Sequence, residues 1–336
     1  MTAPPDAAAP PDPEPRTRRA GRRTWGLAVL PLLPWAIGLL GRWWWLAELF
    51  THFRFQWLLC TGAAALVLLA LRAWRPLAVC GLVALLHAWP MLGGLGHPPA
   101  APEDAAGARG VRVMTANVLI RNTDAAAVLR HVREADPDVI CFQEVGPRWL
   151  ADLSPLHEAY PHRAVTDRDD PFGAAVFSKH PGAFEVVNIE TLPQIRATLD
   201  TPAGPLTVWN VHVSPPAGAR RAGDRDRAMA ELARRVAAEP GPVVVAGDLN
   251  CTAWSPHFAA LLAVGGLSDP RRGGRDPASW RAENPLFALP IDHVLPGGGA
   301  RVTAMTRGPD VGSDHRPLTA AVVLPAAAGA TPKGPR

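Results

Sequence analysis

Hydrophobic and polar positions follow two different patterns along the chain. Before about residue 97, apolar residues form three continuous runs, over 25–41, 55–71 and 76–96. From residue 111 onward, short apolar segments alternate with polar and amphipathic ones. A run of about 20 apolar residues is long enough for a helix that crosses a bilayer, whereas short alternating segments indicate strands. The pattern predicts an N-terminal membrane region and a C-terminal α/β globule.

The ends of the three runs favour a bundle of about three transmembrane helices. Tryptophans, whose indole rings prefer the membrane interface, lie there at Trp43, Trp44, Trp45 and Trp74. The third run has almost no polar side chain, which is unusual for a helix of a soluble protein. Two alternatives stay open: a cleaved signal peptide at the first run, and three buried helices of a soluble protein.

The same pattern gives an organisation for the whole chain. We expect a disordered basic tail over 1–24, the membrane region over 25–96, a linker over 97–110, the globule over 111–324 and a disordered tail over 325–336. Seven arginines lie in the tail and in the connection between the second and third runs. Arginine favours the cytoplasmic side, which predicts a multi-pass protein of the cell membrane with an extracytoplasmic globule. If the first run does not span, the globule is cytoplasmic.

The globule combines predicted strands with two predicted helices. Helical spacing appears over 124–135, with Asp124 as the N-cap, and over 221–239. The strands are expected over 111–118, 136–145, 172–178, 205–213, 241–250, 291–296 and 316–324. Strands that alternate with helices and also follow one another directly predict packed sheets flanked by helices.

Charge and cysteine content exclude several classes of protein. Residues 111–324 hold 22 Lys+Arg and 24 Asp+Glu, so the formal net charge of +4 comes from the rest of the chain. A globule without net positive charge disfavours a nucleic-acid partner. Local arginine clusters keep that alternative open: Arg220, Arg221, Arg225 and Arg227, and Arg271, Arg272 and Arg275. Four cysteines in 336 residues exclude a disulfide scaffold, and we expect Cys141 and Cys251 to be buried.

Polar residues gather where the predicted strands end. They are Asn117, Glu144, His212, Asp248, Asn250, Asp292, Ser313, Asp314 and His315. One such residue is commonly a loop cap, and Asp248 with Asn250 alone would suit an Asx turn. Because the residues recur at the polar end of strand after strand, we expect them to share one site.

Seven segments occur in the order TANV, CFQEV, GAAVFSKHP, NVHV, GDLN, IDHV and GSDHRP. This set resembles the endonuclease/exonuclease/phosphatase superfamily, which includes DNase I-like nucleases, inositol-phosphate 5-phosphatases and sphingomyelinases. The resemblance covers residues 110–324 and implies a four-layer α/β/β/α sandwich with its active site at one edge. With the membrane region, the chain also resembles membrane-bound actinobacterial members of the VanJ type, which are associated with teicoplanin resistance.

The resemblance implies a role for each polar residue. The Mg²⁺ ligands would be Asn117, Glu144 and Asp314, and Mn²⁺ is an alternative ion. Asp248 would orient or deprotonate the attacking water, and Asn250 would donate to a phosphoryl oxygen. Asp292 would orient His315, and His212 would contact the phosphate or protonate the leaving oxygen. Arg196 would either touch phosphate or be a solvated strand arginine. The acidic residue that some nucleases carry before the TANV segment is missing here, which leaves one or two metals open.

These inferences predict a membrane-anchored, Mg²⁺-dependent phosphohydrolase that uses metal-assisted, in-line attack by water. The anchor and the short linker favour a lipid-linked substrate such as a polyprenyl diphosphate. Residues 265–290 would form either a flap with apolar contacts from Trp280, Leu286 and Phe287, or a plain surface loop. The alternatives are a DNA or RNA nuclease and a catalytically inactive membrane-binding module.

Overall fold

A computed structural model describes residues 16–92, 110–166, 168–271, 278–284 and 286–325 of the chain. Residues 1–15 and 326–336 of the predicted tails and residues 97–109 of the predicted linker lie outside this description. Residues 16–24, expected to belong to a disordered tail, are instead helical. The chain divides into two compact units, which are described separately below. The first unit comprises residues 1–36 and 54–89, and the second comprises 37–53 and 90–336.

The first unit is helical. It contains α1 (Arg16–Val29), part of α2 (Leu32–Gly38), α4 (Arg54–Ala70) and most of α5 (Trp74–Leu92). Its small buried core consists of Ala28, Leu68 and Cys80. The second and third apolar runs form α4 and α5, as predicted.

The first apolar run differs from the prediction, because it breaks into α1 and α2 at residues 30–31. Proline lacks a backbone N–H and its ring clashes with the carbonyl four residues earlier, so Pro31 interrupts a helix at this point. In the described part of the chain, no single helix combines the length and the apolar composition of a membrane span. Helix α4 meets both limits only when it is paired with α3 (Trp45–His52) across the break at Phe53.

The second unit contains two mixed sheets. The six-stranded sheet has the order β10-β11-β1-β2-β4-β3. The five-stranded sheet has the order β5-β6-β7-β8-β9. The bounds in the first sheet are β1 (Gly110–Asn117), β2 (Val139–Gln143), β3 (His162–Val165), β4 (Ala174–Ser178), β10 (Arg301–Arg307) and β11 (Leu318–Val323). Those in the second are β5 (Gly182–Ile189), β6 (Leu192–Thr201), β7 (Gly204–His212), β8 (Val243–Asp248) and β9 (Asp292–Gly297).

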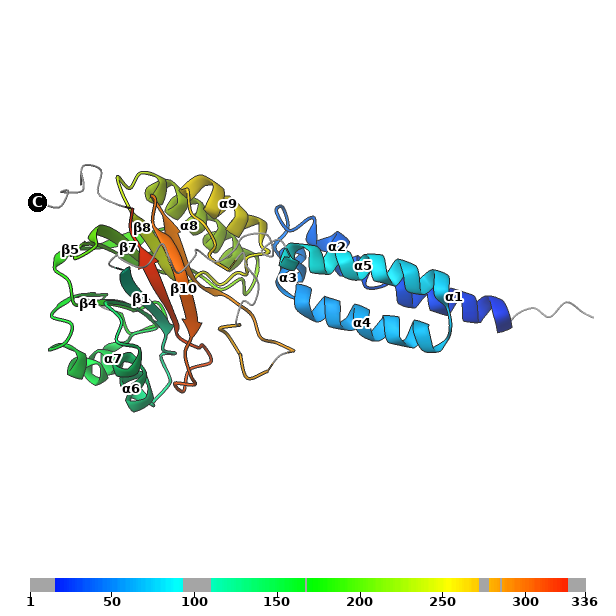
Figure 1. Ribbon diagram of the computed structural model, residues 1–336, viewed down its shortest axis with the longest axis horizontal. Helices are drawn as coiled ribbons and strands as arrows, with labels where there is room; N and C mark the ends of the chain where they lie inside the picture. Colours follow the sequence, from blue (N-terminus) through cyan, green and yellow to red (C-terminus); the bar gives the residue numbers. More distant parts are fainter. Residues whose placement is uncertain (1–15, 93–109, 167, 272–277, 285, 326–336) are drawn as a thin grey trace, which may run out of the picture. The chain divides into compact units, whose positions relative to one another are not determined.

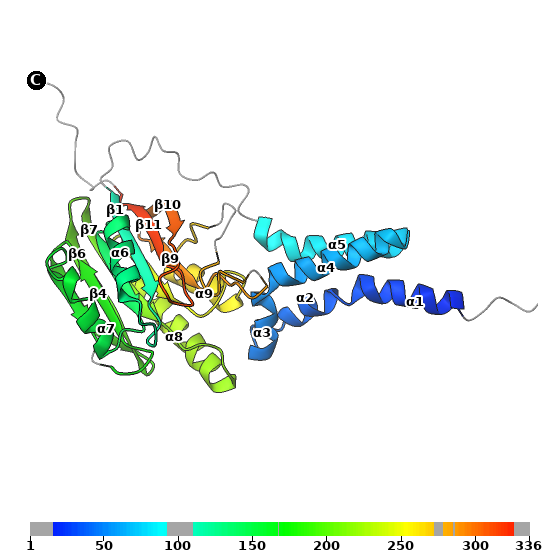
Figure 2. The same ribbon diagram turned by 90° about the horizontal axis from the view of Figure 1, so that it is seen from below.

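Helices cover the outer face of each sheet (Figures 1 and 2). Those on the six-stranded sheet are α6 (Ala125–Ala135) and α7 (Pro147–Asp152), followed by the short 3-10 helix η2 (Ser154–Leu156). Those on the five-stranded sheet are α8 (Ala219–Ala237) and α9 (Pro256–Gly265). Asp124 caps α6, since its side chain accepts a hydrogen bond from the Ala127 amide at 3.0 Å.

Alternating side chains along the strands supply the layers of the sandwich. Val113 packs in the core between the two sheets, whereas its neighbour Met114 packs under α6 and α7. Likewise, Val244 packs between the sheets and Val245 packs under α8 and α9. Successive residues of a strand face opposite sides, so strands covered on both faces appear as continuous apolar runs.

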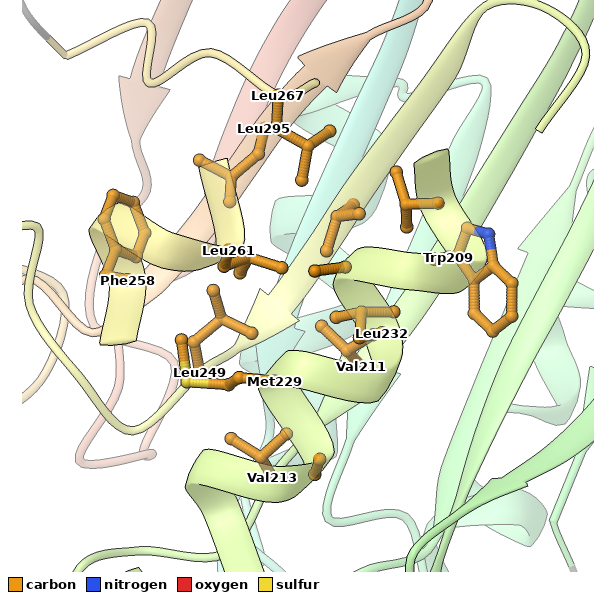
Figure 3. Packing of buried hydrophobic residues seen from close by; sticks show 14 of the residues in the cluster. Trp209, Val211, Val213, Met229, Leu232, Leu249, Phe258, Leu261, Leu267 and Leu295 are labelled. Atoms are coloured by element: carbon orange, nitrogen blue, oxygen red, sulfur yellow. The ribbon is translucent and has the colours of Figure 1, made fainter. Parts of the chain in front are cut away.

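The core under α8 and α9 is shown in Figure 3. Met229 and Leu232 of α8, Leu261 of α9 and Val211 of β7 belong to this cluster. The two sheets and their flanking helices confirm the α/β sandwich. Strands β3, β5, β6 and β10 and helices α3, α7 and α9 were not predicted, and most of these segments are short or partly exposed. Cys141 and Cys251 are fully buried, as expected.

Candidate active site

Strand register aligns three of the predicted residues at one edge of the five-stranded sheet. His212 pairs with Asp248 across β7 and β8, and Asp248 pairs with Asp292 across β8 and β9. Strands β7 and β8 are parallel and end at this edge, whereas the antiparallel β9 begins there. The carboxyl ends of parallel strands meet at one edge of a sheet, so the three side chains come together without any loop.

The six-stranded sheet presents its residues in the same way. Asn117 pairs with Gln143 at the ends of β1 and β2, so Glu144 comes directly after the second strand. His315 lies just before β11, the antiparallel neighbour of β1. The Ser313 hydroxyl donates to the Asn117 carbonyl at 2.7 Å and connects these two segments.

His315 is held between two carboxylates. Its Nδ1 lies 2.8 Å from Asp292 Oδ2, and its Nε2 lies 3.7 Å from Asp248 Oδ2. The first contact is a hydrogen bond in which the ring N–H donates, so Nδ1 carries a proton. The predicted orienting pair is therefore present, and Asp248 faces the other nitrogen of the ring.

Burial and neighbouring charges shift the pKa values of the two histidines in opposite directions. Burial alone would lower the pKa of His315, but the carboxylates of Asp292 and Asp248 outweigh burial and raise it. Burial raises the pKa of Asp248, and the charge of Asp292 adds to this effect. Burial and the charge of His315 lower the pKa of His212 to about 4, so His212 is neutral at pH 7.

Asn117 connects the two sheets. Its Nδ2 donates to Glu144 Oε1 at 3.1 Å and to Asp248 Oδ2 at 3.2 Å. The other oxygen of Glu144 accepts the Ile120 amide at 3.0 Å. Glu144 has a positive φ of 62°, which is uncommon for a residue with a side chain and typical of functional sites.

Asn250 differs from the prediction. Asn250, expected at the end of a strand over 241–250 and as a donor to a phosphoryl oxygen, has a left-handed φ of 47°. Its amide N–H donates to Asp248 Oδ1 at 2.8 Å, which is the Asx turn of the alternative interpretation. Its side-chain Nδ2 donates to the Val213 carbonyl at 2.9 Å. The strand ends at Asp248, so the alternation of an extended chain does not apply beyond it.

His212 lies beside the carboxylate of Asp248, with 3.8 Å between Nε2 and Oδ2. Its ring contacts Phe172 at a centroid distance of 5.2 Å. Its backbone amide donates to Gln194 Oε1 at 2.8 Å, so a buried side chain of β6 holds the end of β7. The sequence patterns did not indicate Phe172 or Gln194, because neither carries charge nor ends a strand.

Asp314 has a partner that the sequence pattern did not reveal. Its Oδ2 accepts a hydrogen bond from Trp280 Nε1 at 3.0 Å, and its carbonyl accepts the Arg281 amide at 2.8 Å. The neighbouring Ser279 hydroxyl accepts the Asp292 amide at 3.1 Å. Residues 278–281 therefore brace both acidic positions. Trp280, expected as an apolar contact of a flap, instead hydrogen-bonds to the site.

Arg196, for which a phosphate contact and a solvated strand position were both open, lies apart from this group and is paired with Glu239. Its Nε and Nη2 donate to the two oxygens of Glu239, each at 2.7 Å. Trp209 Nε1 donates to the same carboxylate at 2.9 Å. This two-point pair occupies the guanidinium of Arg196 and leaves the residue with a structural role.

The donor set fits a hard divalent cation. Potential ligand atoms of Asp248, Asp292 and His315 all lie within 4.8 Å of one another. Asp292 Oδ1 and Asp314 Oδ1 are buried and have no hydrogen-bond partner within the described ranges. Buried carboxylate oxygens are costly without a partner, and Mg²⁺ prefers carboxylate and amide oxygens. This group of possible ligands differs from the predicted set of Asn117, Glu144 and Asp314, although Asn117 donates hydrogen bonds to both Glu144 and Asp248.

Comparison with known proteins agrees with this geometry. Residues 114–315 match the model of the Endonuclease/Exonuclease/phosphatase family. The chain belongs to this family. Membership of this family supports hydrolysis of phosphate esters as the general class of activity. A search of the curated proteins finds no match to this chain.

Solved structures of the endonuclease/exonuclease/phosphatase fold resemble the chain. One, from Beutenbergia cavernae, has a TM-score of 0.52 and 24% identity, and the match covers 64% of this chain and 72% of that one. A humanized D. rerio TDP2 has a TM-score of 0.55 and 16% identity, with 63% and 98% covered. The human Nocturnin catalytic domain with a bound sulfate anion has a TM-score of 0.51 and 17% identity, with 64% and 95% covered. At these identities the likeness concerns the fold alone.

Proposed function

We propose that the chain is a membrane-anchored, Mg²⁺-dependent phosphohydrolase that cleaves a phosphate ester or a diphosphate by attack of water. The observation that carries this proposal is the convergence of Asn117, Glu144, Asp248, Asp292 and His315 from both sheets. Family membership supports the reaction class.

The chain's own residues supply orientation, proton transfer and charge. Asp248 is fixed by Asn117 and by the Asn250 amide, so its carboxylate can orient the attacking water and accept its proton. His315, held by Asp292, presents Nε2 and can stabilise the negative oxygens of the phosphoryl group. His212 lies on the other side of Asp248 and can donate a hydrogen bond to the phosphate.

Glu144, Asn117 and Asp314 remain the residues proposed to hold Mg²⁺, and Asp314 Oδ1 is buried without a hydrogen-bond partner within the described ranges. When bound, Mg²⁺ neutralises phosphate charge and favours departure of the leaving oxygen. No serine or cysteine nucleophile is needed in this scheme.

A lipid-linked substrate, such as a polyprenyl diphosphate, is proposed from exposed apolar surface. Leu66, Trp74, Leu85 and Trp89 in the first unit are each at least 60% exposed. In the second unit, Trp43 and the loop residues Leu286 and Phe287 are also exposed. Exposed apolar surface of this extent is typical of sites that meet lipid or a partner, and tryptophan favours the interface. The VanJ-type likeness also belongs to this proposal.

The arginine clusters give little support to a nuclease. Arg225 is fully buried against Glu48, and Arg227 pairs with Glu190 and Asp224. Arg271 is paired with Asp269, whereas Arg272 and Arg275 lie outside the described residues. Binding to a nucleic-acid backbone normally requires many basic contacts with phosphates. Arg225, Arg227 and Arg271 are already paired with carboxylates, whereas Arg220 and Arg221 are exposed.

The test compares substrates side by side. Purified full-length protein should release phosphate from a polyprenyl diphosphate in Mg²⁺, and EDTA should stop the release. Glu144→Ala should abolish activity, whereas Glu231→Gln, which changes only two exposed ion pairs on α8, should retain it. Plasmid cleavage without turnover of the lipid would favour the nuclease. If Glu144→Ala keeps the activity of the wild type, the proposed site is refuted.

A further inference from the structure

Helix α3 belongs to the same compact unit as the active-site residues, although it lies about 200 residues before Asp248 and the loop that follows Asp248. It carries Glu48 and His52 one helical turn apart, and both are buried. Residues spaced by four lie on one face of a helix. A polar pair on a buried face of so short a helix therefore needs a partner.

Glu48 has two partners. Its Oε2 accepts a hydrogen bond from Arg225 Nη2 of α8, and its Oε1 accepts one from the Ser255 hydroxyl at 2.5 Å. Ser255 is the N-cap of α9, and its Oγ also accepts the His257 amide at 3.1 Å. Arg225 Nη1 in turn donates to the Asn250 carbonyl at 3.4 Å. Glu48 therefore reaches the loop that follows Asp248 from both ends.

His52 contacts the middle of the same loop. Its Nδ1 accepts the Thr252 amide at 3.4 Å and lies 3.0 Å from Thr252 Oγ1. Because an N–H donates to it, Nδ1 carries no proton. From the other side, His293 Nε2 donates to the Cys251 carbonyl at 2.8 Å. The successive loop residues Asn250, Cys251 and Thr252 are thus each held by a buried side chain. For Asn250 and Thr252, the hold depends on a residue of α3.

These contacts hold the loop, and they do not form a second metal site. Ligand atoms of Glu48, Asp226 and His257 lie within 4.8 Å of one another. However, Arg225 contacts both carboxylates, and the second oxygen of Glu48 is taken by Ser255. A buried ion pair adds little stability over apolar packing, but the loss of one partner leaves an unsatisfied charge. The buried Glu48–Arg225 pair is therefore best explained by the loop conformation that it holds in place.

We propose that Glu48 and His52 are positioning residues, through which α3 holds the 250–255 loop and thereby keeps Asp248 and Asn250 in place. The inference rests on the proposed hydrolase function, because Asp248 is its water-orienting group. It means that the N-terminal region completes the catalytic unit as well as anchoring it. A globule cut at the 97–110 linker would lack α3 and therefore the contacts of Glu48 and His52 that hold the 250–255 loop.

The test uses the full chain with Glu48→Leu, Glu48→Gln and His52→Ala. Glu231→Gln, which removes two exposed ion pairs from the helix that carries Arg225, is the matched control. Amide hydrogen exchange of residues 249–256 is measured well below the melting temperature, together with kcat and KM. We expect loop exchange about tenfold faster in Glu48→Leu and kcat about tenfold lower or more, with KM nearly unchanged. Glu48→Gln, which keeps the shape, should recover part of both.

The outcomes separate positioning from general stability. Unchanged loop exchange in Glu48→Leu and His52→Ala overturns the proposal. Faster exchange with wild-type kcat in the folded protein also overturns it, since the contacts would then be structural only. If the wild type hydrolyses no phosphate substrate, the proposed function fails, and loop exchange alone decides whether α3 holds the loop. If Glu48→Leu does not fold, Glu48→Gln and His52→Ala give the same comparison.

Discussion

At the scale of single residues, the site depends on pairs in which one side chain fixes another. Asp292 fixes His315, and Asn117 fixes both Glu144 and Asp248. Sequence alone indicated these residues because each ends or precedes an apolar strand. It could not indicate Ser279 or Gln194, whose hydroxyl and amide brace the site, because uncharged residues of this kind are common everywhere in a chain.

The Asp292–His315 pair should behave as one unit in catalysis. Asp292→Asn and His315→Gln should each lower kcat by about 100-fold or more, and the double variant should lose little beyond the larger single effect. The reason is that the carboxylate acts through the imidazole that it orients. Steady-state kinetics on the same substrate checks this expectation, and losses that multiply independently would contradict it.

Arg196 and Glu239 should affect stability without affecting catalysis. Arg196→Gln should lower the free energy of unfolding by about 1–3 kcal/mol near pH 7, and the folded variant should retain its kcat. Burial raises the pKa of Glu239, but hydrogen bonds from Arg196 and Trp209 outweigh burial and lower it. A lowered folded-state pKa stabilises the protein above the ordinary glutamate pKa and loses this effect as pH falls.

Urea unfolding of the wild type and Arg196→Gln over a pH series measures this difference. It should be largest near neutral pH and shrink as the pH falls through the folded-state pKa of Glu239. A large fall in kcat for the folded variant would instead support a contact between Arg196 and the phosphate of the substrate.

At the scale of elements, close packing between β7 and β8 supports the site. Gly247 precedes Asp248 and has a φ of +146°, and an added Cβ would lie 1.9 Å from the Val211 carbonyl oxygen. Only glycine fits such a backbone at such a distance. The apolar run before GDLN indicated the strand, but this interstrand contact could not be inferred without the register.

Gly247→Ala should therefore destabilise the fold by about 2–4 kcal/mol or prevent folding. Gly241→Ala is the matched control, because a Cβ there meets nothing within 4 Å. Thermal unfolding of both variants tests the difference. Equal melting temperatures for the two variants would show that β7 and β8 separate easily at this point.

At the scale of the whole molecule, metal binding should stabilise the second unit. Mg²⁺ at about 100 times its dissociation constant should add about 2.7 kcal/mol to the free energy of unfolding, if it binds only the folded state. EDTA should remove this gain. The gain should be absent in Glu144→Gln and present in Glu231→Gln, and thermal unfolding with and without Mg²⁺ measures it. A stabilisation that persists in Glu144→Gln would place the ion elsewhere.

Membrane topology is the second expectation at this scale. The arginine distribution predicts a globule outside the cytoplasm if the first apolar run spans the membrane. A reporter enzyme that is active only outside the cytoplasm should therefore be active when fused after Arg336. The same reporter fused at the second connection, near Arg72, is the cytoplasmic control. Activity of the control and silence of the C-terminal fusion would reverse the orientation.

The sequence by itself determined the order of apolar and polar segments, and with it the family, most strands and the list of candidate residues. These features follow from local alternation and from motifs, which need no distant contacts. Only the tertiary structure decided that Arg196 pairs with Glu239, that Asn250 turns out of the strand, and that α3 packs against the active-site loop. Each of these three features depends on contacts between residues that are far apart in the chain. Packing sets which residues meet, and a buried charge is costly unless it has a partner.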